Sequence, residues 1–278
     1  MKKVTVIIPA YNAENYINRM LQSILNQTYK NVECIVVNDG STDKTLEILN
    51  DYINKFKNVG KELVILNQKN KGQAAAINFG LKRVTGEYFI WADSDDFFQL
   101  NAFEILVKAL EENNCDFVRA NAIYRKEDNI DKILTIKKQK DFNQTSLLYD
   151  YLNYREERIP TYIGIMLTRF DYFKTKNKGL DIIENRVGQN LQLILPIVYR
   201  GKAFCLNKEV YNYVIRDNSH SRQKRNVKER IVRMYQGQKL RIKTIRKIAN
   251  RRDKIILSLL IRYRFFYRVI RLIINVIK

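Results

Sequence analysis

The chain has 278 residues, of which 46% are hydrophobic, which is enough for a sizeable core and excludes a disordered protein. Its net charge of +21 is concentrated at one end, because residues 221–278 carry 19 Lys and Arg against two acidic residues, a net charge of +17. Residues 1–220 carry a net charge of only +4, which is ordinary for a globular domain. The chain has no run of 18 uncharged apolar residues, so no membrane-spanning helix is predicted. The spacing of the three cysteines fits neither a disulfide framework nor a metal site: Cys34, Cys115 and Cys205.

The first 100 residues alternate apolar strand patterns with helical periodicity. Strands are predicted at residues 4–8, 32–37, 63–66 and 87–91. Helices are predicted at residues 14–27, from a cap at Ser41 or Thr42 to about Phe56, and at residues 72–83. Such alternation favours βαβ units and a parallel sheet. Polar clusters at residues 9–12, 38–43 and 93–96 each follow a strand, so we expect them to converge on one sheet edge, where nucleotides bind in such folds.

Three carboxylates follow the fourth predicted strand, in the segment Asp93-Ser94-Asp95-Asp96. Carboxylates at the end of a buried strand are costly unless positive charge lies among them. Their oxygen atoms suit a hard divalent cation such as Mg²⁺ or Mn²⁺, which can neutralise a diphosphate. The alternative is a loop of solvated aspartates that caps a helix starting near Leu100.

Five segments form a set: Val6-Ile7-Ile8-Pro9-Ala10-Tyr11-Asn12, Leu21 to Thr28, Val36-Val37-Asn38-Asp39-Gly40-Ser41-Thr42-Asp43, Asn70-Lys71-Gly72 with Ala76 and Asn78, and Asp93 to Asp96. Taken together, these segments resemble the family 2 glycosyltransferases, which share the GT-A fold. A weaker resemblance continues to about residue 222, through Gly188-Gln189-Asn190 and Asn218-Ser219-His220-Ser221-Arg222.

The resemblance implies an α/β GT-A domain over residues 1–222, with a mixed sheet flanked by helices, followed by a C-terminal helical extension over residues 223–278. The nucleotide-binding half would span about residues 1–120 and the acceptor half about residues 121–222. The activity implied is a metal-dependent, inverting transfer of a sugar from a UDP-sugar to a lipid-linked or growing surface glycan.

The same resemblance implies roles for individual residues. Pro9, Ala10, Tyr11 and Asn12 would line the nucleotide pocket, and Asp39 would accept a hydrogen bond from uracil. Gly72 would bring backbone amides near the donor, with Ser94 also on the donor side. Asp93 would face the ribose or the metal, Asp95 would be the main Mn²⁺ or Mg²⁺ ligand, and Asp96 would face the sugar or support the metal ligands from behind. His220, the only histidine, would complete the metal or diphosphate shell, although a surface histidine in a polar loop is the alternative.

The general base departs from the family pattern, in which Gly-Glu-Asp supplies the catalytic aspartate. This chain has Gly188-Gln189-Asn190, and an asparagine cannot accept the acceptor's proton at neutral pH. Asp181 and Glu184 are nearby, and we take Glu184 as the candidate base, with Asn190 positioning the acceptor. The alternative is that Gly188 merely precedes an amphipathic helix that begins with Leu191.

The basic C-terminal segment predicts two helices, at residues 227–249 and 254–278. In the second, one narrow polar stripe interrupts an otherwise apolar surface: Arg264, Arg268, Arg271 and Asn275. A basic helix of this kind suits the surface of an anionic membrane, so we expect a cytoplasmic protein, peripheral on the inner face of the cell membrane. A helical hairpin packed on the domain, with its basic residues solvated, is the alternative. Nucleic acid is a weaker one, since no nucleic-acid-binding motif accompanies the charge.

Two other functions are compatible with the pattern. A nucleotidyltransferase also sets carboxylates and a metal at a nucleotide, but it usually needs a glycine-rich basic loop that is missing at residues 9–12. A non-catalytic protein that binds glycan or membrane on the same fold is suggested by Asn190.

Overall fold

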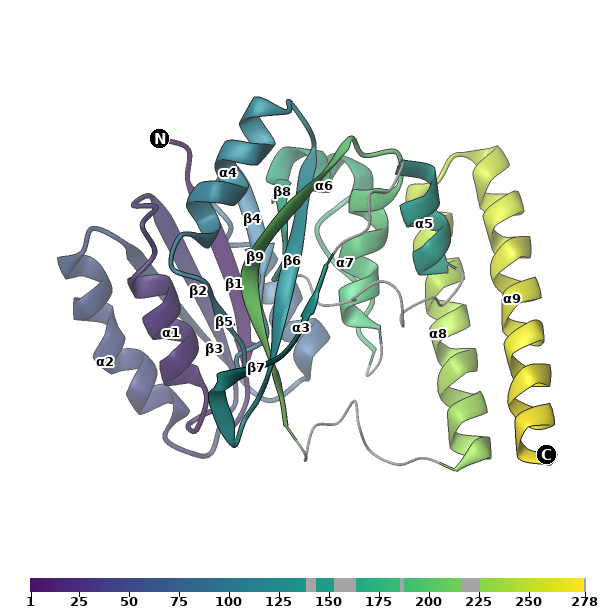
Figure 1. Ribbon diagram of the computed structural model, residues 1–278, viewed down its shortest axis with the longest axis horizontal. Coiled ribbons are helices and arrows are strands. Elements are labelled where there is room, and N and C mark those ends of the chain that lie inside the picture. The colour runs from purple at the N-terminus through teal and green to yellow at the C-terminus, as the bar shows by residue number, and fades with distance from the viewer. Residues whose placement is uncertain (139–143, 153–163, 186–187, 217–225, 278) are drawn as a thin grey trace.

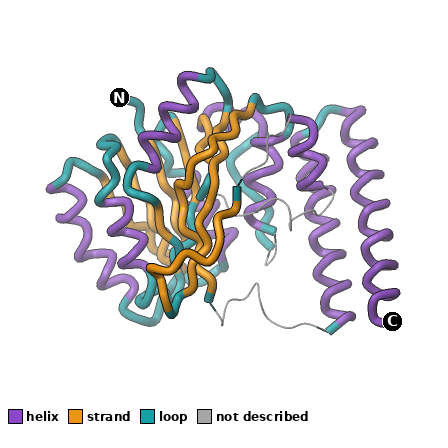
Figure 2. Tube along the Cα trace, in the orientation of Figure 1, coloured by secondary structure: helices purple, strands orange, loops and turns teal. Residues whose placement is uncertain are grey.

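The computed structural model describes residues 1–138, 144–152, 164–185, 188–216 and 226–277. These residues form a mixed β-sheet with helices on both faces and a helical hairpin at the C-terminus (Figures 1 and 2). The strands are β1 Val4–Ala10, β2 Val32–Asp39, β3 Glu62–Gln68, β4 Tyr88–Trp91, β5 Phe97–Phe98, β6 Phe117–Lys126, β7 Asn129–Lys137, β8 Met166–Arg169 and β9 Ala203–Ile215. The helices are α1 Ile17–Leu25, α2 Thr45–Asn58, α3 Gln73–Leu81, α4 Ala102–Glu112, α5 Gln144–Leu152, α6 Phe170–Asn177, α7 Gln189–Val198, α8 Val227–Ile248 and α9 Arg251–Ile277.

The sheet is parallel in its N-terminal part and mixed beyond it. Its order is β3-β2-β1-β4-β8-β6-β9-β5, with β7 paired to β6, and all pairings among β1 to β4 are parallel. The predicted βαβ alternation is therefore confirmed, although β2 continues to Asp39 and α1 starts only at Ile17. β8 runs antiparallel to both β4 and β6, whereas β9 runs parallel to β6. The carboxyl ends of β1, β2, β4, β6 and β9 thus lie at the same edge.

Alternating side chains of the central strands supply two hydrophobic cores, one on each face. Val6 and Ile8 of β1 pack with α1, α2 and α4, while Ile7 between them packs with α3 on the other face. β4 repeats the pattern, since Ile90 faces the first core and Trp91 the second. Burial on both faces explains why these strands read as continuous apolar runs.

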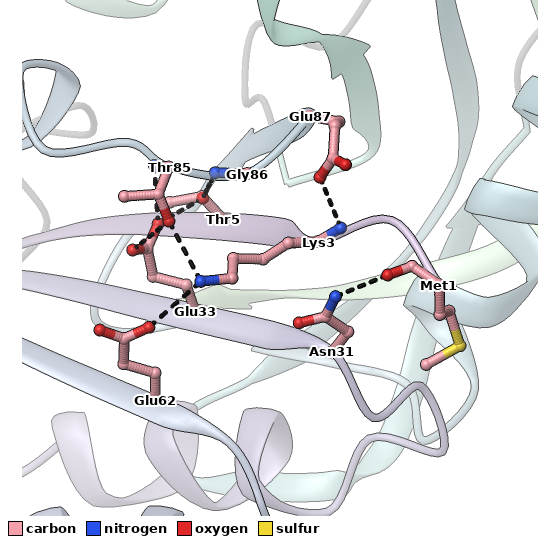
Figure 3. A network of polar contacts seen from close by, with 9 residues as sticks. All are labelled: Met1, Lys3, Thr5, Asn31, Glu33, Glu62, Thr85, Gly86 and Glu87. Carbon is pink, nitrogen blue, oxygen red and sulfur yellow. Dashed lines mark hydrogen bonds and ion pairs between the residues drawn. The ribbon is translucent and has the colours of Figure 1, made fainter.

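A buried carboxylate holds the amino-terminal edge of the sheet (Figure 3). Glu33 of β2 is 1% exposed and accepts hydrogen bonds from Thr5 Oγ1 at 2.5 Å and from Thr85 Oγ1 at 2.8 Å. Lys3 Nζ lies beside them, 3.2 Å from Thr85 Oγ1 and 3.3 Å from Glu62 Oε2. The oxygens of Glu33 are hydrogen-bonded, which accounts for the burial of this carboxylate. It lies at the edge of the sheet opposite the predicted site.

α7, α8 and α9 stack outward in that order from one side of the sheet (Figure 1). The predicted amphipathic character of the run after Gly188 is wrong, because α7 is buried on every side from Leu191 to Val198, between α5, α6 and α8. α8 starts with a capping box between Asn226 and Glu229 and packs on α7, and α9 folds back along α8 (Figure 1). Among the described residues, no helix combines the length and the apolar character needed to cross a bilayer.

Candidate active site

The loops that follow β1 and β2 are hydrogen-bonded to each other at the carboxyl edge of the sheet. Asn12, with a φ of +47°, donates its backbone N–H to Ser41 Oγ at 3.0 Å and accepts from the Thr42 N–H at 2.9 Å. The predicted convergence of these clusters is thereby confirmed. The predicted cap is wrong, because Ser41 and Thr42 contact Asn12, whereas the first amide of α2, on Thr45, donates to Asp43 Oδ1 at 3.0 Å.

The four residues expected to line the nucleotide pocket differ in what they can offer a ligand. Pro9 and Ala10 are buried within β1. Tyr11 is 51% exposed, and Asn12 is also exposed, so these two side chains reach the edge where a base would stack. An exposed aromatic ring at the end of a buried strand is consistent with a stacking role, which stays a prediction.

Asp39, the last residue of β2, ties the strand to the start of α3. It is 3% exposed, and its Oδ1 accepts from Gln68 Nε2 at 2.6 Å and from the Lys71 N–H at 2.9 Å. Its Oδ2 accepts from the Gly72 N–H at 2.8 Å. Gly72 is the N-cap of α3 with a φ of +89°, a conformation that glycine adopts without strain. Each carboxylate oxygen has two lone pairs, so Oδ2 can still accept one more hydrogen bond.

The aspartate loop after β4 lies next to α3. Gln73 Nε2, in the first turn of α3, donates to Asp93 Oδ1 at 3.1 Å, so the third predicted cluster joins the other two. Burial, followed by the charge of Asp95, raises the pKa of Asp93 to about 7. The alternative that these aspartates cap a helix is wrong, because β5 intervenes and the N-cap of α4 is Asn101.

Asp96 holds the aspartate loop against β9. It is 1% exposed, and its Oδ1 accepts from the Val214 N–H at 2.8 Å. Burial and the charges of Asp95 and Asp93 raise the pKa of Asp96 well above its usual range. The hydroxyl of Tyr211, also on β9, accepts from the Asp93 N–H at 3.3 Å. The buried position explains a supporting role for Asp96, and its predicted contact with a sugar stays a prediction.

Two arginines that the sequence analysis did not single out flank Asp95. Arg216, directly after β9, forms an ion pair with the Asp95 carboxylate, and its guanidinium lies 4.4 Å from the ring centre of Tyr16. Arg19 of α1 donates from Nη2 to the Asp95 carbonyl oxygen at 2.5 Å. Arg216 could have been predicted as a site residue, because it immediately follows a strand that ends at this edge. Arg19 lies inside an amphipathic helix and carried no such signal.

The donor set fits a divalent cation bound together with a diphosphate. Within the described ranges there is no group of three or more His, Cys, Asp or Glu that could hold a metal ion. Mg²⁺ and related ions, however, are commonly held by one or two carboxylates plus phosphate oxygens and water. Asp93 and Asp95 supply two such carboxylates, and the pKa of Asp93 is raised by burial and then by the charge of Asp95, which a cation would offset.

The segment that carries Glu184 is fixed between α3 and α7. Asn78 of α3 makes two hydrogen bonds with the backbone of Ile182, at 2.9 Å to its carbonyl oxygen and at 2.8 Å from its N–H. Gln192 of α7 makes the same two hydrogen bonds with the backbone of Ile183, at 2.9 Å to its carbonyl oxygen and at 2.6 Å from its N–H. Glu184 itself is exposed, and the described contacts do not link it to the aspartate loop. Asn78 and Gln192 are therefore positioning residues for this segment.

Asn190 lies in the first turn of α7, which starts after Gly188 with its φ of +75°. The side-chain oxygen of Asn190 is buried, and within residues 188–216 and the other described parts of the chain it has no hydrogen-bond partner. His220, the predicted metal ligand, lies outside the described residues. The roles of Glu184, Asn190 and His220 thus stay predictions.

Comparison with known proteins connects this geometry to a family. The family model described as glycosyl transferase family 2 matches residues 5–175, more than half of the chain. Glycosyltransferase GlyA of Streptococcus pneumoniae is 42% identical over 119 residues, which are 43% of this chain and 16% of that protein. An uncharacterized glycosyltransferase of Haemophilus influenzae is 38% identical over 143 residues, 51% of this chain and 56% of that protein. The chain therefore spans only part of the length of these relatives.

Solved structures share the fold. S. aureus TarS 1–349 in complex with UDP-GlcNAc superposes with a TM-score of 0.70 at 19% identity, over 95% of this chain and 73% of that chain. Mannosyltransferase PcManGT from Pyrobaculum calidifontis, in complex with GDP-Man and Mn²⁺, superposes with a TM-score of 0.60 at 20% identity, over 92% and 68%. The expected GT-A fold is thereby confirmed.

Proposed function

Because this chain belongs to glycosyl transferase family 2, we propose that it transfers a sugar from a UDP-sugar to a hydroxyl of a glycan acceptor, with inversion at the anomeric carbon. One observation carries the proposal: Asp39 anchors the start of α3 directly beside the Asp93–Asp96 loop. The carboxylate that we propose to bind the base, the N-terminus of α3 and the two carboxylates that we propose to bind the metal are thus connected at one sheet edge.

Each part of this edge suits one part of a nucleotide-sugar. The open lone pair of Asp39 Oδ2 can accept the N–H of uracil, which is the reason to prefer UDP over other nucleotides. The ring of Tyr11 can stack on the base, and the amides at the start of α3 favour the diphosphate. The UDP-GlcNAc bound to TarS and the GDP-Man bound to PcManGT support a nucleotide-sugar donor.

Asp93 and Asp95 would hold Mg²⁺ or Mn²⁺, which supplies charge neutralisation for the leaving diphosphate when bound. The Mn²⁺ in PcManGT supports this assignment. Arg216 and Arg19 add positive charge beside Asp95, where preorganised cations stabilise a leaving group without reorganisation. Asp96, buried beneath the loop, keeps these groups in place through Val214.

The acceptor hydroxyl needs a base, and Glu184 is the candidate. Its segment is held by Asn78 on the same helix whose N-terminus faces the donor, so donor and base are positioned by one element. A positioned general base accelerates such a reaction roughly 10²–10⁴-fold. Asn190 would orient the acceptor through its buried side-chain oxygen. The acceptor we propose is a lipid-linked or growing surface glycan.

The test is the release of UDP from a panel of UDP-sugars with Mn²⁺ or Mg²⁺ and mixed glycan acceptors. Turnover of one donor by wild type should be abolished by chelation and by Asp95→Ala, and retained by the matched control Asp51→Ala on the exposed side of α2. The anomeric configuration of the product, read by NMR, should be opposite to that of the donor.

Three outcomes contradict the proposal. UDP binding without turnover of any donor would indicate a binding protein on this fold. Release of pyrophosphate from a nucleoside triphosphate and a sugar phosphate would indicate nucleotidyl transfer. Turnover that survives both chelation and Asp95→Ala would refute the assigned metal site.

A further inference from the structure

The outward surface of α9 is largely apolar from Ile255 to Ile273. α9 packs on the rest of the protein through Leu257, Ile261 and Phe265, which are at most 8% exposed. On the opposite side, side chains at spacings of three and four residues are 43–64% exposed: Ile255, Leu259, Tyr263, Phe266, Ile270 and Ile273. These six residues are the apolar face of α9. Figure 1 shows α9 as the outermost element, outside α8 and away from the sheet.

Part of the polar stripe of α9 lies on the side that packs on the protein, although Arg262 and Arg271 are exposed. Arg264 and Arg268, two members of the predicted polar stripe, are only partly exposed and lie on the side of Ile261 and Phe265. The Nε atom of Arg264 is buried. A solvated helix turns its charges outward and its apolar side chains inward. The orientation of α9 therefore leaves apolar side chains uncovered on its outer side.

Basic side chains border the apolar face. A shallow groove of about 440 Å³ beside it is lined by Arg246, Lys254, Ile255, Ser258, Leu259 and Arg262. Three basic residues thus contribute to the lining of a groove together with apolar side chains. Phosphate groups and acyl chains occur together in this arrangement at the surface of a phospholipid bilayer.

The acidic residues of the C-terminal segment do not neutralise this border. Glu229 is engaged in the capping box with Asn226, at the start of α8. Asp253 accepts hydrogen bonds from Tyr199 Oη at 2.7 Å and from Arg200 Nη2 at 3.0 Å. In the described part of the chain neither carboxylate is hydrogen-bonded to Arg246, Lys254 or Arg262, so the border of the groove stays basic.

We propose that the apolar face of α9 and the bordering groove dock onto an anionic phospholipid bilayer, with α9 lying in the plane of the headgroups. Two partners could cover this face, a second copy of the chain or a bilayer, and charge distinguishes them. Pairing with a second copy through α9 would bring two segments of net charge +17 together, whereas an anionic bilayer compensates that charge. The proposal is independent of the proposed function, because binding to vesicles requires neither donor nor acceptor.

The arrangement of the hairpin relates the docking surface to the site. α8 begins and α9 ends at the end of the molecule where β9 ends, which is the edge that carries Arg216 and the aspartate loop (Figure 1). α7 and α8 stand between α9 and the sheet (Figure 1), so the docking surface and that edge are on different sides of the molecule.

The experiment is flotation of the full chain with vesicles of phosphatidylcholine containing about 30% phosphatidylglycerol, and with phosphatidylcholine alone. We expect partitioning to be roughly a hundredfold stronger on the anionic vesicles, because three groove cations each contribute, and to weaken at about 0.5 M salt. Leu259→Ser combined with Phe266→Ser should reduce partitioning by about tenfold or more. Lys254→Gln combined with Arg262→Gln should remove most of the preference for anionic lipid.

The control is Ile53→Ser, which changes an exposed apolar residue of α2 that is 43% exposed. It should partition like wild type, and the thermal transition of all variants should match, since the substituted side chains are outside the core. Equal partitioning of wild type and the Leu259/Phe266 variant would overturn the proposal, as would no binding by wild type. A concentration-dependent dimer in light scattering that this variant converts to monomer, without vesicle binding, would assign the face to a second copy instead.

Discussion

The substitution Asp39→Asn tests whether this carboxylate both stabilises the donor site and binds the base of the nucleotide. The carboxylate accepts three hydrogen bonds, two of them from the backbone amides of Lys71 and Gly72. An asparagine keeps one oxygen, so its NH₂ group must face at least one N–H donor. Leaving a buried donor unsatisfied costs about 1–3 kcal/mol, and the remaining bonds lose their charge assistance. We expect the free energy of unfolding to fall by about 2–4 kcal/mol and UDP affinity to fall at least about tenfold.

The assay is urea denaturation followed by circular dichroism, combined with calorimetric titration of UDP. Asp51→Asn is the matched control, because this exposed aspartate of α2 undergoes the same chemical change outside the site. A change of less than about 0.5 kcal/mol for Asp39→Asn would refute the view that these bonds hold the loop. Unchanged stability together with lost UDP binding would mean that Asp39 contacts the base but does not build the site.

Three further outcomes follow from other contacts. Mn²⁺ affinity should rise about tenfold from about pH 6 to about pH 8, because Asp93 has a pKa of about 7 and binds metal only when deprotonated; a flat profile in titration calorimetry would contradict this. Asn78→Ala leaves both backbone groups of Ile182 without their partner, so unfolding free energy should fall by about 1–3 kcal/mol and kcat should fall more than the KM for donor changes, as steady-state kinetics would show. Lys61→Met removes a buried ammonium that donates to three carbonyl oxygens at the end of α1, at 2.7–3.2 Å, and should cost about 2–4 kcal/mol in urea unfolding, unlike Lys57→Met on the surface of α2.

The parallel part of the sheet was predictable because burial on both faces leaves a direct trace in the sequence. β1 and β4 read as apolar runs, and the polar clusters after the strands met at one edge as expected. The limits of the elements were less predictable. Asp39 belongs to β2 because it pairs with Gln68 of β3, and pairing of this kind is not visible in local periodicity.

The far side of the sheet could not be read in the same way. β5 has two residues and exists through its pairing with β9, so no local pattern indicates it. Arg216 reaches Asp95 only because β9 runs parallel to β6 and ends at the same edge as β4. The orientation of α9 was also hidden, since the sequence shows a polar stripe but not which side faces the protein. These features depend on partners that are distant along the chain.

The hydrogen bond between Asp96 and Val214 can form only after both residues have been synthesised. The two residues are 118 positions apart, and Tyr211 and Arg216 contact the same loop from the same late strand. At a synthesis rate of about 5–20 residues per second, the aspartate loop leaves the ribosome roughly 6–24 s before β9 follows. During that interval three neighbouring carboxylates have no β9 to hold them. The N-terminal strands can pair early, but this edge of the sheet is completed only after β9 has been synthesised.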